Sequence, residues 1–237
     1  MKKLIDYLNG ECVVWNEFSA MMQGQNMAKN PQFTAKIVAT KLPVLGWYIP
    51  TLRKLAKAVQ KEKVLSVIDK IKVQNYEDTL LKALLLGRIN DIDELMPRLN
   101  EFVLSIDNWS TCDLLCSELK IVKKHRLVFW GLIQSYINSG KEFVERVGIV
   151  LLLKYYLDDE YIAKTLALLK NKKSSFYYVN MAIAWTFAEA CVNSGGQILE
   201  FLKTYQNDIV VKMLVGKVRD SFRVDKEIKD KIRQNYA

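Results

Sequence analysis

The sequence contains a single histidine, His125, and this scarcity excludes several chemistries. A metal site made of several histidines is impossible, and Ser-His-Asp or Cys-His catalysis would depend on His125 alone. The four cysteines (Cys12, Cys112, Cys116 and Cys191) form no Cys-x-x-Cys pair, so we expect buried, reduced thiols. Glycine-rich loops that hold nucleotide phosphates are also missing from the sequence. We therefore expect neither a metal nor another cofactor.

Long apolar runs are missing too. The longest, residues 147–153, is less than half of the ~18–20 apolar residues that a membrane-spanning helix needs. The first six residues contain two lysines and an aspartate and lack the apolar region and cleavage site of a signal peptide. Half of the 237 residues are apolar, which is enough for a sizeable core. We expect a cytoplasmic, monomeric protein with no membrane partner, folded as one domain over residues 1–237.

Proline is confined to the first 97 residues, and the apolar residues that follow are spaced as in helices. Signals for helix starts recur in this later part at a nearly constant interval. They lie at Asn75, Asn108, Gly140, Ser174 and Asn207, which are 33, 32, 34 and 33 residues apart. The first of them resembles a capping box, because Asp78 follows Asn75 by three residues.

A second start signal follows within each interval. These signals lie at Asp91, His125, Asp158, Gly195 and Asp225. The pattern predicts an all-α, HEAT-like repeat α-solenoid with about five helix pairs over residues 75–237. Residues 1–62 are less regular and are expected to form basic N-terminal helices. A globin-like bundle is the alternative, but it does not predict such even spacing.

Acidic residues are missing between Glu17 and Glu62, although seven basic residues lie in that stretch and the net charge is +9. The positive electrostatic field of such a stretch suits a polyanion, and we expect the partner to be double-stranded DNA. A membrane surface and an ordinary solvated surface are the alternatives. The lysines and arginines that we expect to contact DNA are Arg53, Lys54, Lys57, Lys120, Lys124 and Arg219.

One helix start carries side chains suited to chemistry. Trp109 and Asp113 are four residues apart, so they lie on the same face of a helix. Lys120 and Lys124 are expected to continue that face. Each residue also has an ordinary structural interpretation, because a tryptophan in a helical repeat is most often core and an aspartate in a first turn is often a cap-side charge.

Two further residues follow at repeat spacing. Arg146 lies 33 residues after Asp113, and Trp185 lies in the next repeat within a run of small and apolar residues. In a solenoid, equivalent helices of successive repeats are neighbours, so these residues and Trp109 would converge on three adjacent inner helices. The two aromatic faces suit a sugar, and the carboxylate suits a developing positive charge. The guanidinium suits a phosphate. Alternatively, Arg146 pairs with a glutamate on its own helix.

At these positions the sequence resembles the AlkD-like DNA alkylation repair proteins, HEAT-like-repeat DNA glycosylases that excise N3- and N7-alkylated purines. The resemblance covers most of the chain. The matching segments are Leu42–Gly46, Ile49–Lys57, Asp107–Asp113, Phe143–Val150, Tyr177–Trp185 and Lys217–Val224.

The resemblance implies a mechanism. Alkylation makes the purine cationic and a good leaving group. Asp113 matches the aspartate that stabilises the oxocarbenium-like sugar and positions the attacking water. Trp109 and Trp185 match the aromatic pair that packs against the sugar, and Arg146 matches an arginine that contacts phosphate. Catalysis is thereby expected to rest on Asp113, Trp109 and Trp185, without metal or cofactor.

Three functions stay open at this point. The first is hydrolysis of the N-glycosidic bond of cationic alkylpurines. The second is a non-catalytic paralogue that binds bent, branched or damaged DNA, because Ala188 stands where active members often carry arginine. The third is a protein-binding scaffold, a common use of HEAT arrays.

Overall fold

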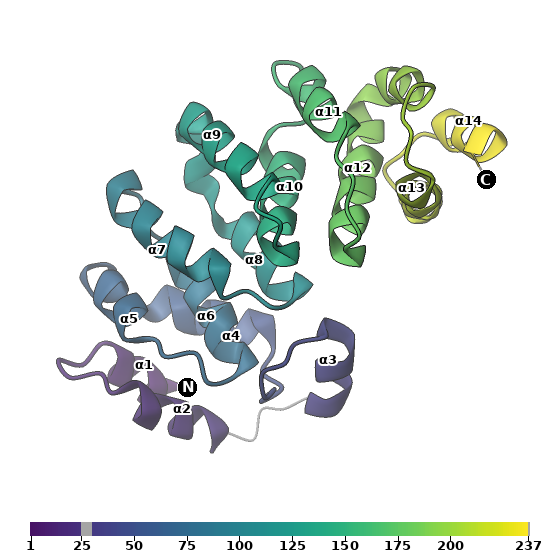
Figure 1. The fold of residues 1–237 in the computed structure, drawn as a ribbon. Helices are drawn as coiled ribbons and strands as arrows, with labels where there is room; N and C mark the ends of the chain where they lie inside the picture. Colours follow the sequence, from purple (N-terminus) through teal and green to yellow (C-terminus); the bar gives the residue numbers. More distant parts are fainter. Residues whose placement is uncertain (25–29, 237) are drawn as a thin grey trace. The chain divides into compact units, whose positions relative to one another are not determined.

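The computed structural model describes residues 1–24 and 30–236. The described residues form fourteen α-helices and two short 3-10 helices, with no strand among them (Figure 1). The helices of the first half are α1 (Lys2–Leu8), α2 (Trp15–Gln23), α3 (Pro31–Val38), α4 (Ile49–Ala58), α5 (Val64–Lys70), α6 (Tyr76–Leu86), α7 (Ile92–Leu104) and α8 (Trp109–Glu118). Those of the second half are α9 (Arg126–Ile137), α10 (Glu142–Tyr155), α11 (Ile162–Lys170), α12 (Tyr177–Leu202), α13 (Asp208–Asp220) and α14 (Lys226–Tyr236). The 3-10 helices are η1 (Lys61–Lys63) and η2 (Lys120–Lys124).

The chain divides into two compact units, residues 1–125 and residues 126–237. Each contains stacked helix pairs, which confirms the predicted all-α, HEAT-like solenoid class. The expectation of one domain over residues 1–237 stays a prediction. The two units are described separately below.

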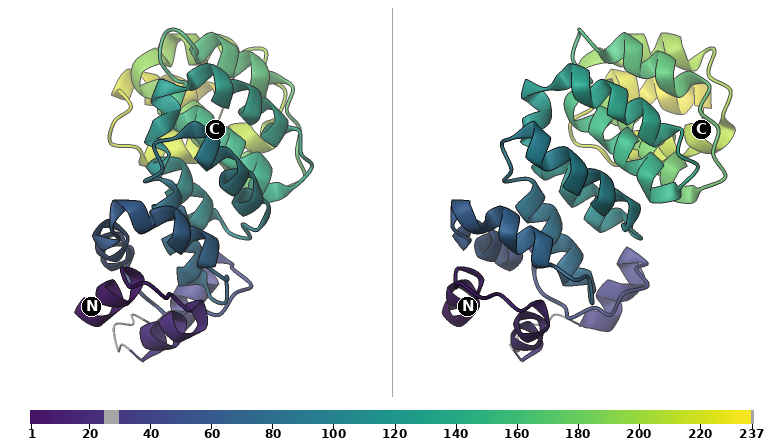
Figure 2. Two further views of the ribbon diagram at one scale, coloured as in Figure 1. Left: turned by 90° about the vertical axis from the view of Figure 1, so that its left-hand side faces the viewer. Right: turned by 60° about the vertical axis from the view of Figure 1, so that its left-hand side comes forward.

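In the first unit, α4, α6 and α8 follow one another as direct neighbours (Figure 2). Polar side chains about one repeat apart join α6 to α8. The Tyr76 hydroxyl donates to Ser110 Oγ at 2.6 Å, and the hydroxyls of Thr79 and Thr111 lie 2.8 Å apart. All four residues are buried, so these bonds set the lateral position of one helix against the next.

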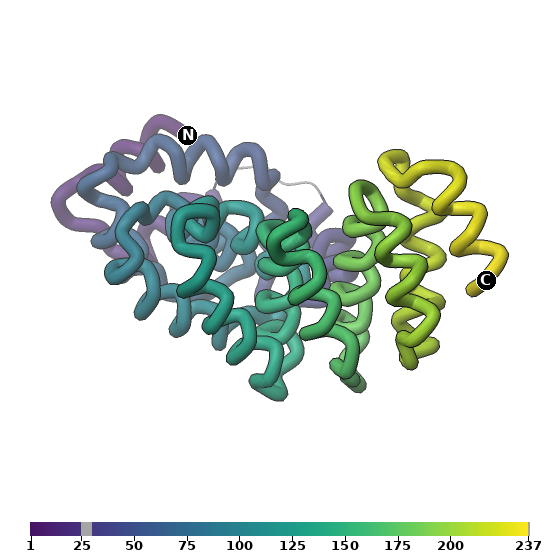
Figure 3. The backbone as a smooth tube through the Cα atoms, turned by 90° about the horizontal axis from the view of Figure 1, so that it is seen from above, coloured from purple at the N-terminus to yellow at the C-terminus, as the bar shows by residue number. Residues whose placement is uncertain are grey.

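In the second unit, α10, α12 and α13 lie side by side (Figure 3). Helix α9 packs against α10, α11 against α12, and α14 against both α12 and α13. Contacts again join residues one repeat apart, since the backbone N–H of Tyr178 donates to Glu142 Oε1 at 3.1 Å. The 33-residue interval found in the sequence is therefore the spacing of helices in contact.

Several predicted helix starts are confirmed. Asn75 and Asp78 form a capping box in which the Asn75 side chain accepts from the Asp78 N–H. Asn108, Asn207 and Asp91 also cap their helices through their side chains. Each such cap contributes about 1 kcal/mol to helix stability. The predicted starts near His125 and Asp225 coincide with the first residues of α9 and α14.

Other predicted starts are displaced. The helix expected at Ser174 begins at Tyr177, and the one expected at Asp158 begins at Ile162. In contrast, the start predicted at Gly195 directly follows a kink at Ser194 (φ −131°, ψ 35°), which divides α12 into two helical segments with no loop between them. Gly195 follows the kink, and a Cβ there would lie 2.7 Å from side-chain atoms of Ile228. Glycine thus allows α14 to approach the kinked helix closely.

No disulfide joins any of the four cysteines, which all lie within the described residues. Cys112, Cys116 and Cys191 are buried as predicted, and burial raises the pKa of the Cys191 thiol to about 12. The prediction of burial is wrong for Cys12, which is exposed in the loop between α1 and α2, whereas the next residue, Val13, is buried.

Two buried carboxylates begin α6. Glu77 is fully buried and accepts the backbone N–H groups of Leu45, Gly46 and Trp47 at 2.7–3.1 Å. Asp78 accepts the N–H groups of residues 74 and 75. Burial raises the pKa of both carboxyl groups, that of Asp78 to about 6, although the N–H donors oppose this shift. The three donors to Glu77 anchor the segment before α4 onto the start of α6.

The raised pKa of Asp78 predicts a pH dependence of stability. Between pH about 4 and about 6 the unfolded carboxyl loses its proton while the folded one keeps it, so the free energy of unfolding falls as pH rises. We expect wild type to lose up to about 3 kcal/mol relative to Asp78→Asn across this window. Urea unfolding at pH 4, 5, 6 and 7 measures the difference. Parallel pH profiles of the two proteins would contradict the burial argument.

Candidate DNA interface

Helix α8 turns only one row of side chains toward solvent. Trp109, Asp113 and Ser117 are partly exposed and lie at i, i+4 and i+8, whereas residues 110–112 and 114–116 are buried. Glu118 is the one other partly exposed residue of this helix. The expected common face of Trp109 and Asp113 is thus present, and its side chains are accessible to a ligand.

The Trp109 indole is held by α3. Its Nε1–H donates to the Ile37 carbonyl oxygen at 3.1 Å. Two residues earlier, Asp107 accepts the Thr40 hydroxyl at 3.0 Å and the Lys41 N–H at 2.8 Å. The end of α3 and the following residues are therefore fastened to the start of α8, and one edge of the indole is fixed. Sequence reasoning missed these contacts, which join residues 66–72 apart.

The prediction that Lys120 and Lys124 continue the face of Asp113 is wrong. Helix α8 ends at Glu118, and Leu119 adopts a non-helical conformation (φ −73°, ψ 56°). Leu119 is fully buried, so the chain turns there, and both lysines belong to η2. They are exposed, but their direction is set by this tighter helix and not by α8.

The basic residues of α4 differ in their partners. Arg53 forms an ion pair with Glu118 at the end of α8. Lys54 and Lys57 are exposed, and no ion pair to either occurs within the described part of the chain. Lys29, one of the seven basic residues of the acid-free stretch, lies outside the described residues.

In the second unit, Arg146 is only 4% exposed. Its guanidinium donates to the Tyr178 carbonyl oxygen on α12 at 2.8 Å. The neighbouring Glu145 pairs with Lys172 at 2.8 Å, and Glu142 accepts from Tyr178. Arg146 therefore bridges the adjacent helices α10 and α12, a role that its spacing alone did not indicate.

Trp185 lies on the solvent-facing row of α12. Residues 178, 181, 185 and 189 are partly exposed, and those between them are buried. The Lys154 ammonium lies over the indole of Trp185, 5.2 Å from the ring centroid. Sequence reasoning missed Lys154, although it lies 31 residues before Trp185, about one repeat away. Arg219, the last predicted contact, is exposed on α13 and pairs with Asp220 at 2.8 Å.

The predicted site residues thus form two sets. Trp109 and Asp113 share a face in the first unit, whereas Arg146 and Trp185 lie on adjacent helices of the second. The convergence of the two sets stays a prediction. Across residues 1–24 and 30–236, no cluster of His, Cys, Asp and Glu could hold a metal ion. The same residues contain no helix long and apolar enough to span a bilayer.

A family model described as "DNA alkylation repair enzyme" matches residues 16–213. The chain belongs to this family. The AlkD-like resemblance is thereby confirmed, and the chain has a role in DNA repair. A search of curated proteins found no match.

The match to the DNA alkylation repair enzyme family includes all of α2 except its first residue, helices α3 to α12, and the first six residues of α13. It therefore contains Trp109, Asp113, Arg146 and Trp185, whereas Arg219 lies beyond its end. DNA is the partner that the family implies. The side chains on the exposed rows of α8 and α12 are the first candidates for contact with it.

Removing the Asp107 carboxylate tests whether α3 is fastened to the helix that carries Trp109. In Asp107→Ala, the bonds from Thr40 and Lys41 are lost, so we expect amide hydrogens of residues 31–41 to exchange roughly 10-fold faster. Hydrogen exchange followed by mass spectrometry measures this. Trp109→Phe, which keeps an aromatic ring but removes the donor, should give a smaller change in the same segment, and peptides from α6 should not change in either variant. Unchanged exchange in residues 31–41 would contradict the anchoring role.

Proposed function

We propose that this protein binds duplex DNA and hydrolyses the N-glycosidic bond of purines made cationic by alkylation at N3 or N7. Membership of the DNA alkylation repair enzyme family supports the substrate class. The observation that carries the proposal is the exposed row of α8, where a carboxylate lies one helical turn from an indole on an otherwise buried helix.

The chemistry requires little from the protein beyond charge and position. An alkylated purine already carries the positive charge that makes it leave, so the bond between the sugar C1′ and the base nitrogen breaks without a proton donor. Positive charge then develops on the sugar, and the Asp113 carboxylate stabilises it by several kcal/mol when water is excluded. Water adds its oxygen to C1′ and releases a proton, while the base departs neutral.

The indoles would shape the surface on which the sugar rests. The Trp109 ring is fixed along one edge by its bond to Ile37, so its faces are presented without a further loss of side-chain freedom. In the second unit, Trp185 offers a ring with an ammonium group over it. That ammonium, of Lys154, is suited to a phosphate next to the sugar.

Exposed lysines would supply most of the phosphate contacts. In the proposal, Lys54, Lys57, Lys120 and Lys124 lie along a basic DNA-binding groove, and each is exposed. Arg53, Arg146 and Arg219 contribute less, because each is engaged by a carboxylate or a carbonyl of the protein. Arg146, which is buried, would present only an edge of its guanidinium.

A non-catalytic DNA-binding protein is the second candidate. Ala188, at the position where active family members often carry arginine, is buried in α12. The chain therefore has no arginine at that position to accompany Trp185. Shape and phosphate contacts alone would then recognise bent or damaged DNA.

Release of N7-methylguanine from a methylated duplex distinguishes the two candidates. We expect wild type to release the base and Asp113→Asn to be slower by roughly 10²–10³-fold, because the amide does not carry the charge that stabilises the sugar cation. Asp159→Asn, which changes an exposed aspartate between α10 and α11, is the matched control and should keep the wild-type rate. Equal rates in wild type and Asp113→Asn would remove Asp113 from the reaction. No release by wild type, with binding retained, would favour the second candidate.

The salt dependence of binding tests the groove. Log Kd for duplex DNA should rise linearly with the logarithm of the salt concentration. A double variant that combines Lys54→Gln and Lys57→Gln should lower this slope by up to about 2. The pair Lys2→Gln with Lys3→Gln removes the same charge from α1 and is the control. Fluorescence anisotropy with a labelled duplex measures both. Duplex affinity that is insensitive to salt would favour a protein-binding scaffold.

A further inference from the structure

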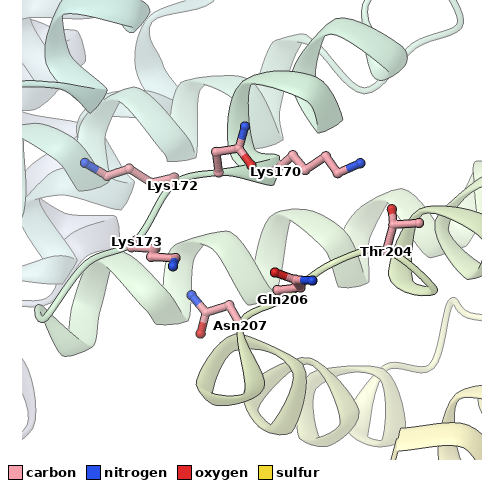
Figure 4. A pocket seen from close by; sticks show the side chains of 7 residues that line it. Lys170, Lys172, Lys173, Thr204, Gln206 and Asn207 are labelled. Atoms are coloured by element: carbon pink, nitrogen blue, oxygen red, sulfur yellow. The ribbon is translucent and has the colours of Figure 1, made fainter.

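A basic recess of about 500 Å³ lies wholly within the second unit. One wall is formed by the end of α11 and the residues that follow it, and the other by the loop between α12 and α13 (Figure 4). None of its residues belongs to the proposed catalytic face. The residues that line it are Lys170, Asn171, Lys172, Lys173, Thr204, Gln206 and Asn207.

The charge of the recess is of one sign. Three lysines line it and no carboxylate does. Lys172 is engaged elsewhere, because it pairs with the buried Glu145 at 2.8 Å and donates to the Ile137 carbonyl at 2.6 Å. These bonds fix the loop that carries Lys173 and begins directly after Lys170, the last residue of α11. Lys170 and Lys173 are exposed, and neither has a carboxylate partner among the described residues.

Neutral donors complete the lining. The Asn207 side-chain oxygen Oδ1 accepts the Val210 N–H at 3.2 Å as the cap of α13, so the side-chain N–H₂ is the part of Asn207 that can donate to a ligand. Gln206 adds a second amide from the same loop. Figure 4 shows Lys173 directed toward Asn207, and Lys170 reaching to the side where Thr204 lies. Two ammonium groups are thus separated along the recess, with amides below them.

We propose that this recess binds the phosphodiester backbone of DNA, one strand passing between Lys170 and Lys173. A phosphodiester provides two acceptor oxygens and one negative charge, which match an ammonium and an amide. Separated ammonium groups suit a strand with successive phosphates better than one small anion, which requires donors that converge. The inference rests on the DNA binding of the proposed function but not on its glycosidic chemistry.

The test uses a double variant that combines Lys170→Gln and Lys173→Gln. Its affinity for a labelled duplex is compared with that of wild type at several salt concentrations. We expect the doubly substituted protein to bind roughly 10-fold more weakly at low salt and to show a salt slope smaller by about 1 to 2. Lys170→Arg with Lys173→Arg keeps the charge and should restore both values. Lys2→Gln with Lys3→Gln is the matched control, and thermal unfolding of every variant verifies folding.

Two results would overturn the inference. The first is a salt slope and affinity equal to those of the control variant. The second is stabilisation of wild type by inorganic phosphate that the Gln variant loses, with DNA binding unaffected, because this would identify a site for a free anion. Base release reports separately on the proposed function. A recess-dependent salt slope without base release would refute only the glycosylase, and base release with an unaffected slope would refute only the recess.

Discussion

The lateral contact between helices one repeat apart is the constraint on which the rest of the structure depends. In both units, buried or half-buried polar groups join residues 32–36 apart, as the Tyr76–Ser110, Arg146–Tyr178 and Glu142–Tyr178 bonds illustrate. Apolar packing alone would let neighbouring helices slide, because aliphatic contacts are not directional. Each buried donor that loses its acceptor costs about 1–3 kcal/mol, so these bonds fix one register.

Because the register is fixed, α8 and the part of α12 before the kink at Ser194 are buried on most of their circumference and leave a single main row for solvent. On α8 that row contains Trp109 and Asp113, and on α12 it contains Trp185. Most other residues of α8 and of the first part of α12 form the core, so few side chains decide the chemistry of this surface. The carboxylate at position 113 can then act on a ligand at no cost to the packing beneath it.

The sequence predicts the helices better than the site. The 33-residue interval, the caps at Asn75, Asn108 and Asn207, and the shared face of Trp109 and Asp113 all follow from local rules that hold in the structure. The end of α8 does not follow from these rules. The helical spacing of apolar residues continues past Glu118, whereas in the structure the chain turns at the buried Leu119. The bond from Trp109 to Ile37 and the cation over Trp185 join distant residues, so no local pattern contains them.

Arginines and lysines differ in their interactions within the protein, so they differ in how they can contribute to binding a polyanion. A count of +9 treats every lysine and arginine alike. In the structure, Arg53, Arg126 and Arg223 are engaged by carboxylates and Arg146 by a backbone carbonyl, so the arginines serve largely to hold helices in place. Exposed lysines such as Lys54, Lys57, Lys170 and Lys173 form no ion pair with a carboxylate among the described residues. An ammonium on a flexible stem makes a point contact with phosphate, whereas a guanidinium fork suits a fixed bidentate partner. The division is consistent with a protein that uses arginine for its own architecture and lysine for a polyanion whose position along the surface varies.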